Sequence, residues 1–372
     1  MCEVALGRVG IQQRVLPDYR VPFFDMLAAA CPRGLSVFAG QPRPEEAVVS
    51  AAGLHVARYA AARNRHFLSP RSPFYFCWQE NLLDWLEDWQ PEALIVEANP
   101  RYRSTPAAVR WMHARRRPVI GWGLGAPAAR GPLGRWRARA WPPFLRQFDA
   151  LIAYSPRGAE EYRAYGFPAE RVFVAPNAVA PRPTAPPPPR SCDSSAAATV
   201  LFVGRLQARK RVDVLLRACA SLPPELQPRL IVVGDGPERE TLQRLAQAVY
   251  RCAEFPGAHT GSRLEPYFAA ADVFVLPGTG GLAVQQAMAH ALPVIVGRGD
   301  GTQDYLVRPE NGWRIPDGDL PALVETLRTA LSDKPRLRRM GEASYRIVAE
   351  EINLENMVSV FLQALMACSP CS

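Results

Sequence analysis

The chain has 372 residues, and at about 150 residues per domain this length predicts two domains. Apolar residues make up 48% and charged residues 21%, a globular composition that excludes a largely disordered protein. The formal charge of +9 is almost all arginine, with 42 Arg against two Lys. It therefore indicates a composition bias, and because no nucleic-acid-binding motif accompanies it, we expect no nucleic-acid partner.

Targeting and metal signals are absent from the sequence. There is no run of about 18 apolar residues and no basic-then-apolar opening segment, so we expect a cytoplasmic protein without a membrane span or signal peptide. The eight cysteines are scattered, and their one close pair is Cys368-x-x-Cys371. A zinc site needs a second pair or nearby histidines, so we expect reduced cysteines and no metal.

In the first half, short apolar runs bounded by turn residues predict buried strands. These runs are residues 93–97, 118–122, 150–154 and 171–175. Trp85 and Trp89 recur with two leucines at helical spacing and predict an amphipathic helix before the first run, with both indoles in the core.

Residues 180–198 contain six prolines and predict an extended linker between two domains. Beyond it, strands alternate with helices of about ten residues, which predicts βαβ units and a parallel sheet. The expected strands are 199–203, 230–233, 271–276 and 292–296, and the expected helices are 212–220, 238–249 and 283–290. Two such α/β domains would face each other across a cleft at the carboxyl ends of their sheets.

The first chemical signal follows the strand 199–203. Gly204 permits a sharp turn, and Arg205 and Lys210 can then converge on one anion beside the strand end. A guanidinium fork with a compact ammonium suits a diphosphate. The alternative is a solvated basic turn, since Arg209 and Arg211 are neighbours.

Two further turns follow strands of the same domain. Gly234-Asp235-Gly236-Pro237 precedes a helix and is by itself good turn chemistry. Pro277-Gly278-Thr279-Gly280-Gly281-Leu282 would bring backbone N–H groups to the positive end of the next helix, an arrangement that binds phosphate. The combination of three such turns favours a nucleotide site.

The sequence resembles the family 4 glycosyltransferases, whose GT-B fold has two facing Rossmann-like domains. The likeness covers nearly the whole chain and is densest over residues 200–316. Its motifs are the three turns above, with 16–24, 149–155, 176–179, 270–277, 287–288, 292–295 and 311–312. The resemblance implies an acceptor-side domain over 1–179, the linker 180–198, a nucleotide-sugar domain over 199–348, and a C-terminal helix within 349–372 that crosses back to the first domain.

The resemblance also implies roles for these residues. Arg205 and Lys210 would neutralise the donor diphosphate as the nucleotide leaves. Backbone amides of Gly280, Gly281 and Leu282 would hold the distal phosphate, and the turn 234–237 would lie near the base. Such enzymes usually retain the anomeric configuration and use no metal, so no cofactor is expected beyond the nucleotide-sugar co-substrate.

Several positions depart from the family pattern. Two glutamates are common eight positions apart, and here Gly278 and Gln286 stand in their place. The glutamine can still accept from a ribose hydroxyl, while Gly278 offers only backbone to the donor sugar. Leu124 stands where many members carry a histidine, His113 replaces it in residue type only, and Glu97 is the better candidate for the cleft.

The segment 130–146 holds five arginines, two tryptophans and no acid. It could form a peripheral contact with anionic lipid at the inner face of a membrane, or simply a solvated helix. We expect a transferase acting on a glycan or lipid-linked saccharide. A non-catalytic GT-B protein that binds a nucleotide sugar or a partner transferase is the main alternative, and a GT-B epimerase and a nucleic-acid-binding protein are weaker ones.

Overall fold

The structure is a computed structural model that describes residues 7–368, apart from 44–45, 47, 70–71, 73, 127–133, 135–137, 191–196 and 300–301. The chain forms two compact units. The N-terminal unit comprises the residues up to Val179 together with those from Leu354 onward, and the C-terminal unit comprises Ala180–Asn353.

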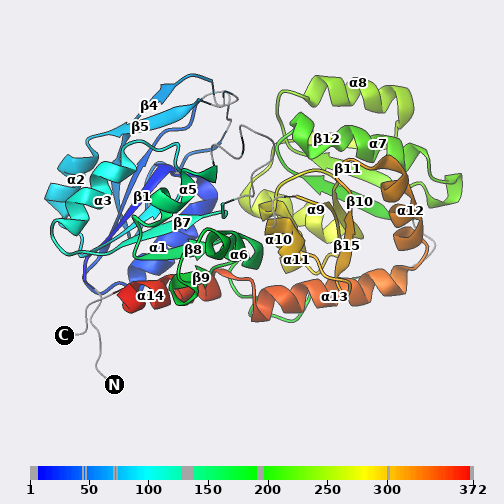
Figure 1. The fold of residues 1–372 in the computed structure, drawn as a ribbon. Helices are drawn as coiled ribbons and strands as arrows, with labels where there is room; N and C mark the ends of the chain where they lie inside the picture. Colours follow the sequence, from blue (N-terminus) through cyan, green and yellow to red (C-terminus); the bar gives the residue numbers. More distant parts are fainter. Residues whose placement is uncertain are drawn as a thin grey trace. The chain divides into compact units, whose positions relative to one another are not determined.

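The N-terminal unit is built on a parallel sheet in the strand order β3-β2-β1-β6-β7-β8-β9 (Figure 1). The strands are β1 Val9–Val15, β2 Leu35–Gly40, β3 Arg58–Ala61, β6 Ala93–Glu97, β7 Val119–Gly123, β8 Ala150–Ala153 and β9 Val172–Val174. Its helices include α1 Val21–Ala29, α2 Leu82–Trp89, α3 Thr105–His113, α5 Trp141–Leu145, α6 Pro156–Ala164 and α14 Leu354–Cys368. The four predicted strands and the predicted helix are present, whereas β1, β2 and β3 were not predicted.

The last helix of the chain completes the core of this unit. Phe361 of α14 packs against Phe23 of α1 and Trp122 of β7, with both pairs of ring centroids 4.9 Å apart. All three side chains are fully buried. The N-terminal unit is therefore discontinuous in sequence, because its core needs residues from both ends of the chain.

A separate antiparallel hairpin was also not predicted. It consists of β4 Arg63–Phe67 and β5 Phe76–Glu80, which form a two-stranded sheet of their own (Figure 1). The residues of β4 are mostly polar, so the sequence carries no apolar run at this place.

The C-terminal unit contains a parallel sheet in the order β12-β11-β10-β13-β14-β15 (Figure 1). Its strands are β10 Thr199–Val203, β11 Arg229–Val233, β12 Ala253–Gly257, β13 Val273–Leu276, β14 Val294–Gly297 and β15 Gly312–Ile315. Its helices are α7 Val212–Ala220, α8 Arg239–Val249, α9 Glu265–Ala270, α10 Leu282–Ala289, α11 Thr302–Leu306, α12 Leu320–Leu331 and α13 Lys334–Glu350. The predicted elements agree with these within about two residues, but the edge strands β12 and β15 were not predicted.

Residues 180–190 and 197–198 of the proline-rich segment are described and belong to the C-terminal unit. Arg190 of this segment is half-buried and donates to the carbonyl oxygens of Phe268 at 2.9 Å, Ala269 at 3.3 Å and His290 at 2.6 Å, as well as to that of Ala271. These carbonyls lie at the carboxyl ends of α9 and α10, where a cation is favourable. Burial, with a contribution from nearby Arg338, lowers the pKa of Arg190 to about 10.

Candidate active site

The three predicted glycine turns lie at one edge of the C-terminal sheet. Gly204 follows β10, Gly234 follows β11 and Gly278 comes two residues after β13. The chain runs from β10 outward to β12 and then returns to the other side of β10 as β13. Ligands of open parallel sheets bind at such a switch point, outside the carboxyl ends of the strands.

Backbone hydrogen bonds bring these turns together. The amide of Leu206 donates to the carbonyl oxygen of Asp235 at 2.8 Å, and that of Glu238 donates to Leu206 at 3.1 Å. On the other side, the amide of Thr279 donates to the carbonyl oxygen of Arg209 at 3.1 Å. The segment 204–210 therefore lies between the two other turns, as a shared ligand site requires.

Lys210 lies directly over the glycine-rich turn. It ends the short 3-10 helix η4, Ala208–Lys210, and a Cβ built on Gly280 would lie 2.0 Å from the Lys210 Nζ. Gly280 also has a φ of +136°, a backbone conformation that glycine adopts readily and other residues rarely adopt. The ammonium thus occupies the space beside the first turn of α10, whose N–H groups have no partner within the helix.

The other predicted residues of this site lie close by in the chain. Arg205 is half-buried and directly follows Gly204 at the end of β10. The Asp235 carboxylate accepts from the amide of Gly236 at 2.7 Å and so shapes its own turn, with Pro237 completing the connection toward α8. The roles predicted for them in donor binding stay predictions.

Gln303 holds the glycine-rich turn and was missed in the sequence. Its buried carboxamide accepts from the amide of Gly280 at 2.6 Å and donates to the carbonyl oxygens of Gly278 at 3.0 Å and Gly297. The Gly280 amide is therefore engaged within the protein. Of the three amides predicted to hold the distal phosphate, those of Gly281 and Leu282 are the two at the start of α10.

The Gly278 position is closed by backbone. A Cβ there would lie 2.0 Å from the carbonyl oxygen of Arg209 and 2.7 Å from the carbonyl carbon of Lys210. The glutamate of the family pattern is thus not merely absent, because the η4 segment occupies the place where its side chain would begin. Gln286 is half-buried on α10.

Gln285, which precedes Gln286 on α10, has a structural role. The buried Gln285 carboxamide accepts from the amide of Ala180 and donates to the carbonyl oxygen of Ile352, both at 3.0 Å. These two residues lie at the two places where the chain enters and leaves the C-terminal unit. The helix that begins at the glycine-rich turn is therefore tied to both ends of its unit.

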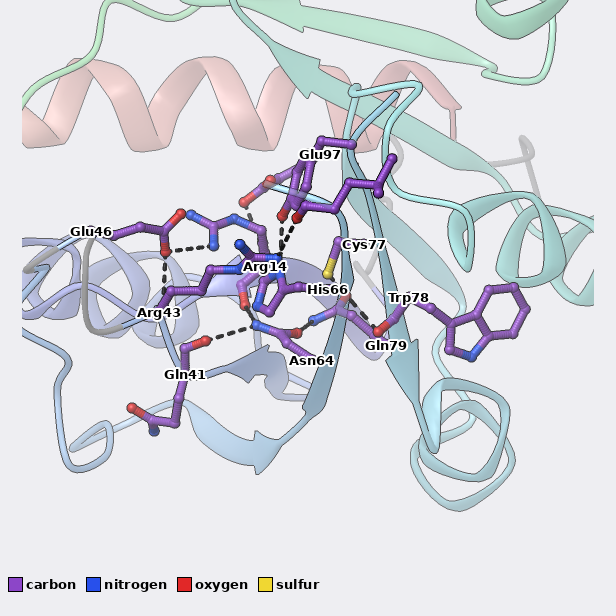
Figure 2. Close-up of polar contacts among 12 residues, drawn as sticks. Arg14, Gln41, Arg43, Glu46, Asn64, His66, Cys77, Trp78, Gln79 and Glu97 are labelled. Carbon is purple, nitrogen blue, oxygen red and sulfur yellow. Dashed lines mark hydrogen bonds and ion pairs between the residues drawn. The ribbon is translucent and has the colours of Figure 1, made fainter. Parts of the chain in front are cut away.

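A second polar cluster lies in the N-terminal unit, around Arg14 and Glu97 at the carboxyl ends of the adjacent strands β1 and β6 (Figure 2). The Glu97 carboxylate accepts from the Arg14 amide at 3.1 Å, and the Arg14 guanidinium donates to Glu46 at 2.8 Å. Burial raises the pKa of Glu97, and Arg14 offsets part of this effect. Burial and the Glu97 charge together raise the pKa of Tyr102.

This cluster also lies at a switch point, because the chain builds β2 and β3 on one side of β1 and then crosses to β6. Glu97 is partly accessible, and its oxygens can accept hydrogen bonds from hydroxyl groups. The other two N-terminal positions considered in the sequence, His113 and Leu124, are more exposed than Glu97. The exposed His113 Nε2 lies at hydrogen-bond distance, 3.0 Å, from the Asp149 carboxylate, and Leu124 is half-exposed.

The predicted lipid segment 130–146 lies only partly within the described residues, which include 134 and 138–146. In α5, Phe144 and Leu145 are buried, and Trp141 packs on Phe144 and Tyr165. These side chains of α5 thus pack within the N-terminal unit, and the rest of the lipid prediction falls mostly on residues outside the described part of the chain.

Two family models match consecutive parts of the chain. One is described as "Glycosyl transferase 4-like domain" and matches residues 23–178, and the other, "Glycosyl transferases group 1", matches residues 197–333. The chain belongs to the family 4 glycosyltransferases. The predicted family is therefore confirmed.

Relatives of this glycosyltransferase include the lipopolysaccharide core biosynthesis glycosyltransferase LpsE of Rhizobium meliloti (strain 1021), 26% identical over 77% of this chain and 88% of the relative. The sulfoquinovosyl transferase SQD2 of Arabidopsis thaliana is 33% identical, but the match spans 39% of this chain and only 29% of that protein.

Solved structures confirm the predicted GT-B fold. The lipopolysaccharide outer core galactosyltransferase WaaB superposes with a TM-score of 0.69 at 17% identity, covering 97% of this chain and 99% of that one. Anabaena HepE in complex with UDP and glucose gives 0.67 at 14% identity, covering 97% and 100%. In this glycosyltransferase, no helix of the described residues has the length and apolar character needed to cross a membrane.

Proposed function

We propose that this glycosyltransferase moves a sugar from a nucleotide-diphosphate-sugar donor to a hydroxyl of a glycan or lipid-linked saccharide. The observation that carries the proposal is the position of the Lys210 ammonium over the glycine-rich turn that opens α10. A cation and the positive end of a helix there favour the same anionic ligand, and a diphosphate is the anion common to such donors.

Arg205 and Lys210 act on the leaving group in this proposal. Negative charge grows on the distal phosphate as the bond between the sugar's anomeric carbon and the phosphate oxygen breaks, and preorganised cations stabilise that charge without reorganising. Two cations in place of a bound metal support a metal-independent reaction. The family resemblance supports retention of the anomeric configuration.

The acceptor side belongs to the N-terminal unit in this proposal, with Glu97 as a hydroxyl-binding group. Its carboxylate lies at the end of β6 with a raised pKa, in a cluster that also holds Arg14 and Tyr102. LpsE and WaaB are named as glycosyltransferases of the lipopolysaccharide core, which supports a saccharide or lipid-linked acceptor here.

The test is slow hydrolysis and transfer across a panel of UDP-, GDP-, ADP- and TDP-sugars, with mixed saccharide acceptors. Lys210→Ala should lower kcat/KM about 30- to 150-fold, corresponding to the ~2–3 kcal/mol of deleting one charged donor at a developing anion. Lys334→Ala is the matched control, because it removes the other lysine of the chain. Equal turnover of wild type and Lys210→Ala would contradict the assignment.

The same assay tests the finer points. The anomeric configuration of the product, followed by NMR, tests retention, and unchanged rates in excess EDTA test metal independence. The closed position at Gly278 favours one second candidate, a non-catalytic GT-B protein. Tight nucleotide-sugar binding without release of nucleotide would support it.

A further inference from the structure

Arg20 is a buried cation that forms no ion pair within the described part of the chain. It lies in the short turn that follows β1 and is only 6% exposed. Its guanidinium donates to the side-chain oxygen of Asn177 and to the Met357 Sδ at 3.8 Å, and neither of these groups carries a charge. The carboxylate of Asp18 instead accepts from the Tyr19 amide at 2.7 Å. Because buried arginines are normally paired, Arg20 lacks an expected partner.

Aromatic rings cover the guanidinium without accepting hydrogen bonds from its edge. The central carbon of Arg20 lies 5.0 Å from the ring centroid of Trp122, 5.7 Å from that of Tyr19 and 5.9 Å from that of Phe23. Such rings attract the charge, but a guanidinium also has five N–H donors that require acceptors. The Trp122 indole adds a further donor, because its Nε1 is buried and has no hydrogen-bond partner among the described residues. This place in the unit therefore has more donors than acceptors.

The Glu97 carboxylate lies beside these donors. Glu97 and Trp122 are paired in register on the adjacent parallel strands β6 and β7, so both side chains point to the same face of the sheet, on strands about 4.8 Å apart. Burial raises the pKa of Glu97, and the nearby charges of Arg14 and Arg20 offset part of this effect. In the described structure, however, Glu97 and Arg20 form no ion pair with each other. A carboxylate and a guanidinium thus lie side by side without satisfying one another.

The surroundings of these two groups suit a sugar ring. They lie at the carboxyl edge of the N-terminal sheet, where ligands of parallel sheets bind. Tyr19 is 40% exposed and Glu97 is partly accessible, so a ligand can approach from this side. Tyr154, which follows β8, packs on Trp122 with ring centroids 5.3 Å apart. Aromatic side chains with a few polar groups among them are typical of sites for small organic ligands.

We propose that Tyr19, Arg20, Glu97 and Trp122 bind two adjacent hydroxyl groups of a neutral sugar ring in the acceptor. A hydroxyl is both a donor and an acceptor, so one hydroxyl donates to the Glu97 carboxylate while the oxygen of the next accepts from the Arg20 guanidinium. A phosphate would satisfy Arg20 but would be repelled by Glu97. The proposal rests on the proposed function and deepens it, because it names the acceptor as a glycan with a free vicinal diol.

The test is direct binding to the full chain, without any donor, followed by saturation-transfer difference NMR. The probes are the methyl α-pyranosides of D-mannose, D-galactose and D-glucose, and at least one of them should bind. Arg20→Met and Glu97→Gln should each weaken its binding at least about 10-fold, the effect of losing a hydrogen bond to a charged group. Because both groups hold one diol, the double variant should lose little more than either single variant.

Arg8→Met is the matched control for the loss of an arginine. Arg8 also lies over a tryptophan, 5.9 Å from the ring centroid of Trp89, but it precedes β1 and so lies at the opposite edge of the sheet. This variant should bind the probe within about 2-fold of wild type. Circular dichroism and thermal midpoints verify that each variant is folded. Should Arg20→Met not fold, Tyr19→Ala tests the same cluster from an exposed position and should weaken binding at least about 3-fold.

The possible results separate the diol from other ligands. No binding of any pyranoside to the wild type, or equal binding by Arg20→Met, overturns the proposal. Tighter binding of glucose 6-phosphate or galacturonic acid than of the neutral glycosides, lost in Arg20→Met, would assign the cluster to an anion instead.

The binding assay contains no donor, so it is independent of the proposed transfer reaction. Binding that depends on Arg20 and Glu97 without any turnover of nucleotide sugars would refute the transferase and leave the diol site standing. Turnover with an unchanged acceptor KM in Arg20→Met would do the reverse.

Discussion

Alanine at Gly278 should destabilise the C-terminal unit and displace the segment that carries Lys210. The new Cβ would lie 2.0 Å from the Arg209 carbonyl oxygen, whereas real Cβ atoms essentially never come closer than 3.0 Å to such a neighbour. Relief requires η4 to move, which breaks the 3.1 Å hydrogen bond from the Thr279 amide to Arg209. Overpacking of about 1–3 kcal/mol and a lost hydrogen bond of about 1 kcal/mol give ~2–4 kcal/mol in total.

Differential scanning calorimetry measures this effect. For a unit of this size, ~2–4 kcal/mol lowers the thermal midpoint of its transition by about 5–15 °C. Gly281→Ala is the matched control three residues away, because Gly281 has a φ of −120° and its Cβ would meet the nearest atom, the Thr302 Oγ1, at an ordinary 3.4 Å. That variant should stay within about 3 °C of wild type. Equal midpoints for the two variants would refute the reasoning from backbone closure, and Gly278→Glu should behave like Gly278→Ala without gaining activity.

Three further changes test other contacts. Arg190→Met leaves the carbonyl groups at the ends of α9 and α10 without their cation and should lower the C-terminal midpoint by at least about 6 °C, whereas an unchanged midpoint would show that the contacts of Arg190 add no stability. Gln303→Met should lower the free energy of nucleotide binding by more than it lowers the free energy of unfolding, because Gln303 fixes the glycine-rich turn. Calorimetric titration with UDP or GDP measures the first quantity and the thermal midpoint reports the second. A larger loss in unfolding than in binding would make the residue purely structural. Burial, with the charge of Arg190, lowers the pKa of His290, so the unfolded chain binds more protons below about pH 6.5 and stability should fall as the pH drops through that value. His290→Gln should lack this component in midpoints recorded between pH 5 and 8, and identical pH profiles would exclude it.

The sequence predicts four of the six strands in the parallel sheet of the C-terminal unit, because these strands are continuous apolar runs between turn residues. It fails for β4, which reads Arg-Asn-Arg-His-Phe and has only one apolar residue. The side-chain amides of Asn64 in β4 and Gln79 in β5 stabilise the inner face of this hairpin by donating to backbone carbonyl oxygens of β1, and such long-range hydrogen bonds leave no local pattern. The edge strand β12 was also missed, because it contains a proline, a residue that argues against a strand except at the edge of a sheet.

The candidate site was predicted in part because glycine turns after strands have a distinct local signal. Their convergence could be argued from a parallel sheet alone, since carboxyl ends meet at one edge. Gln303 could not be found this way, because a single glutamine in a polar stretch looks like a surface residue until its three backbone partners are known. The closure over Gly278 was also beyond the sequence, which shows a missing glutamate but not the carbonyl group that takes its place.

The position of α14 has a consequence for how the protein is made. Phe361 fills the space between Phe23 and Trp122, yet the whole C-terminal unit is synthesised before it. At about 5–20 residues per second, translation of that unit takes roughly 10–35 s, during which the nascent N-terminal sheet lacks its last helix. The C-terminal unit can thus finish folding first, and the N-terminal core becomes complete only after the 15-residue helix α14 is synthesised and packs against Phe23 and Trp122.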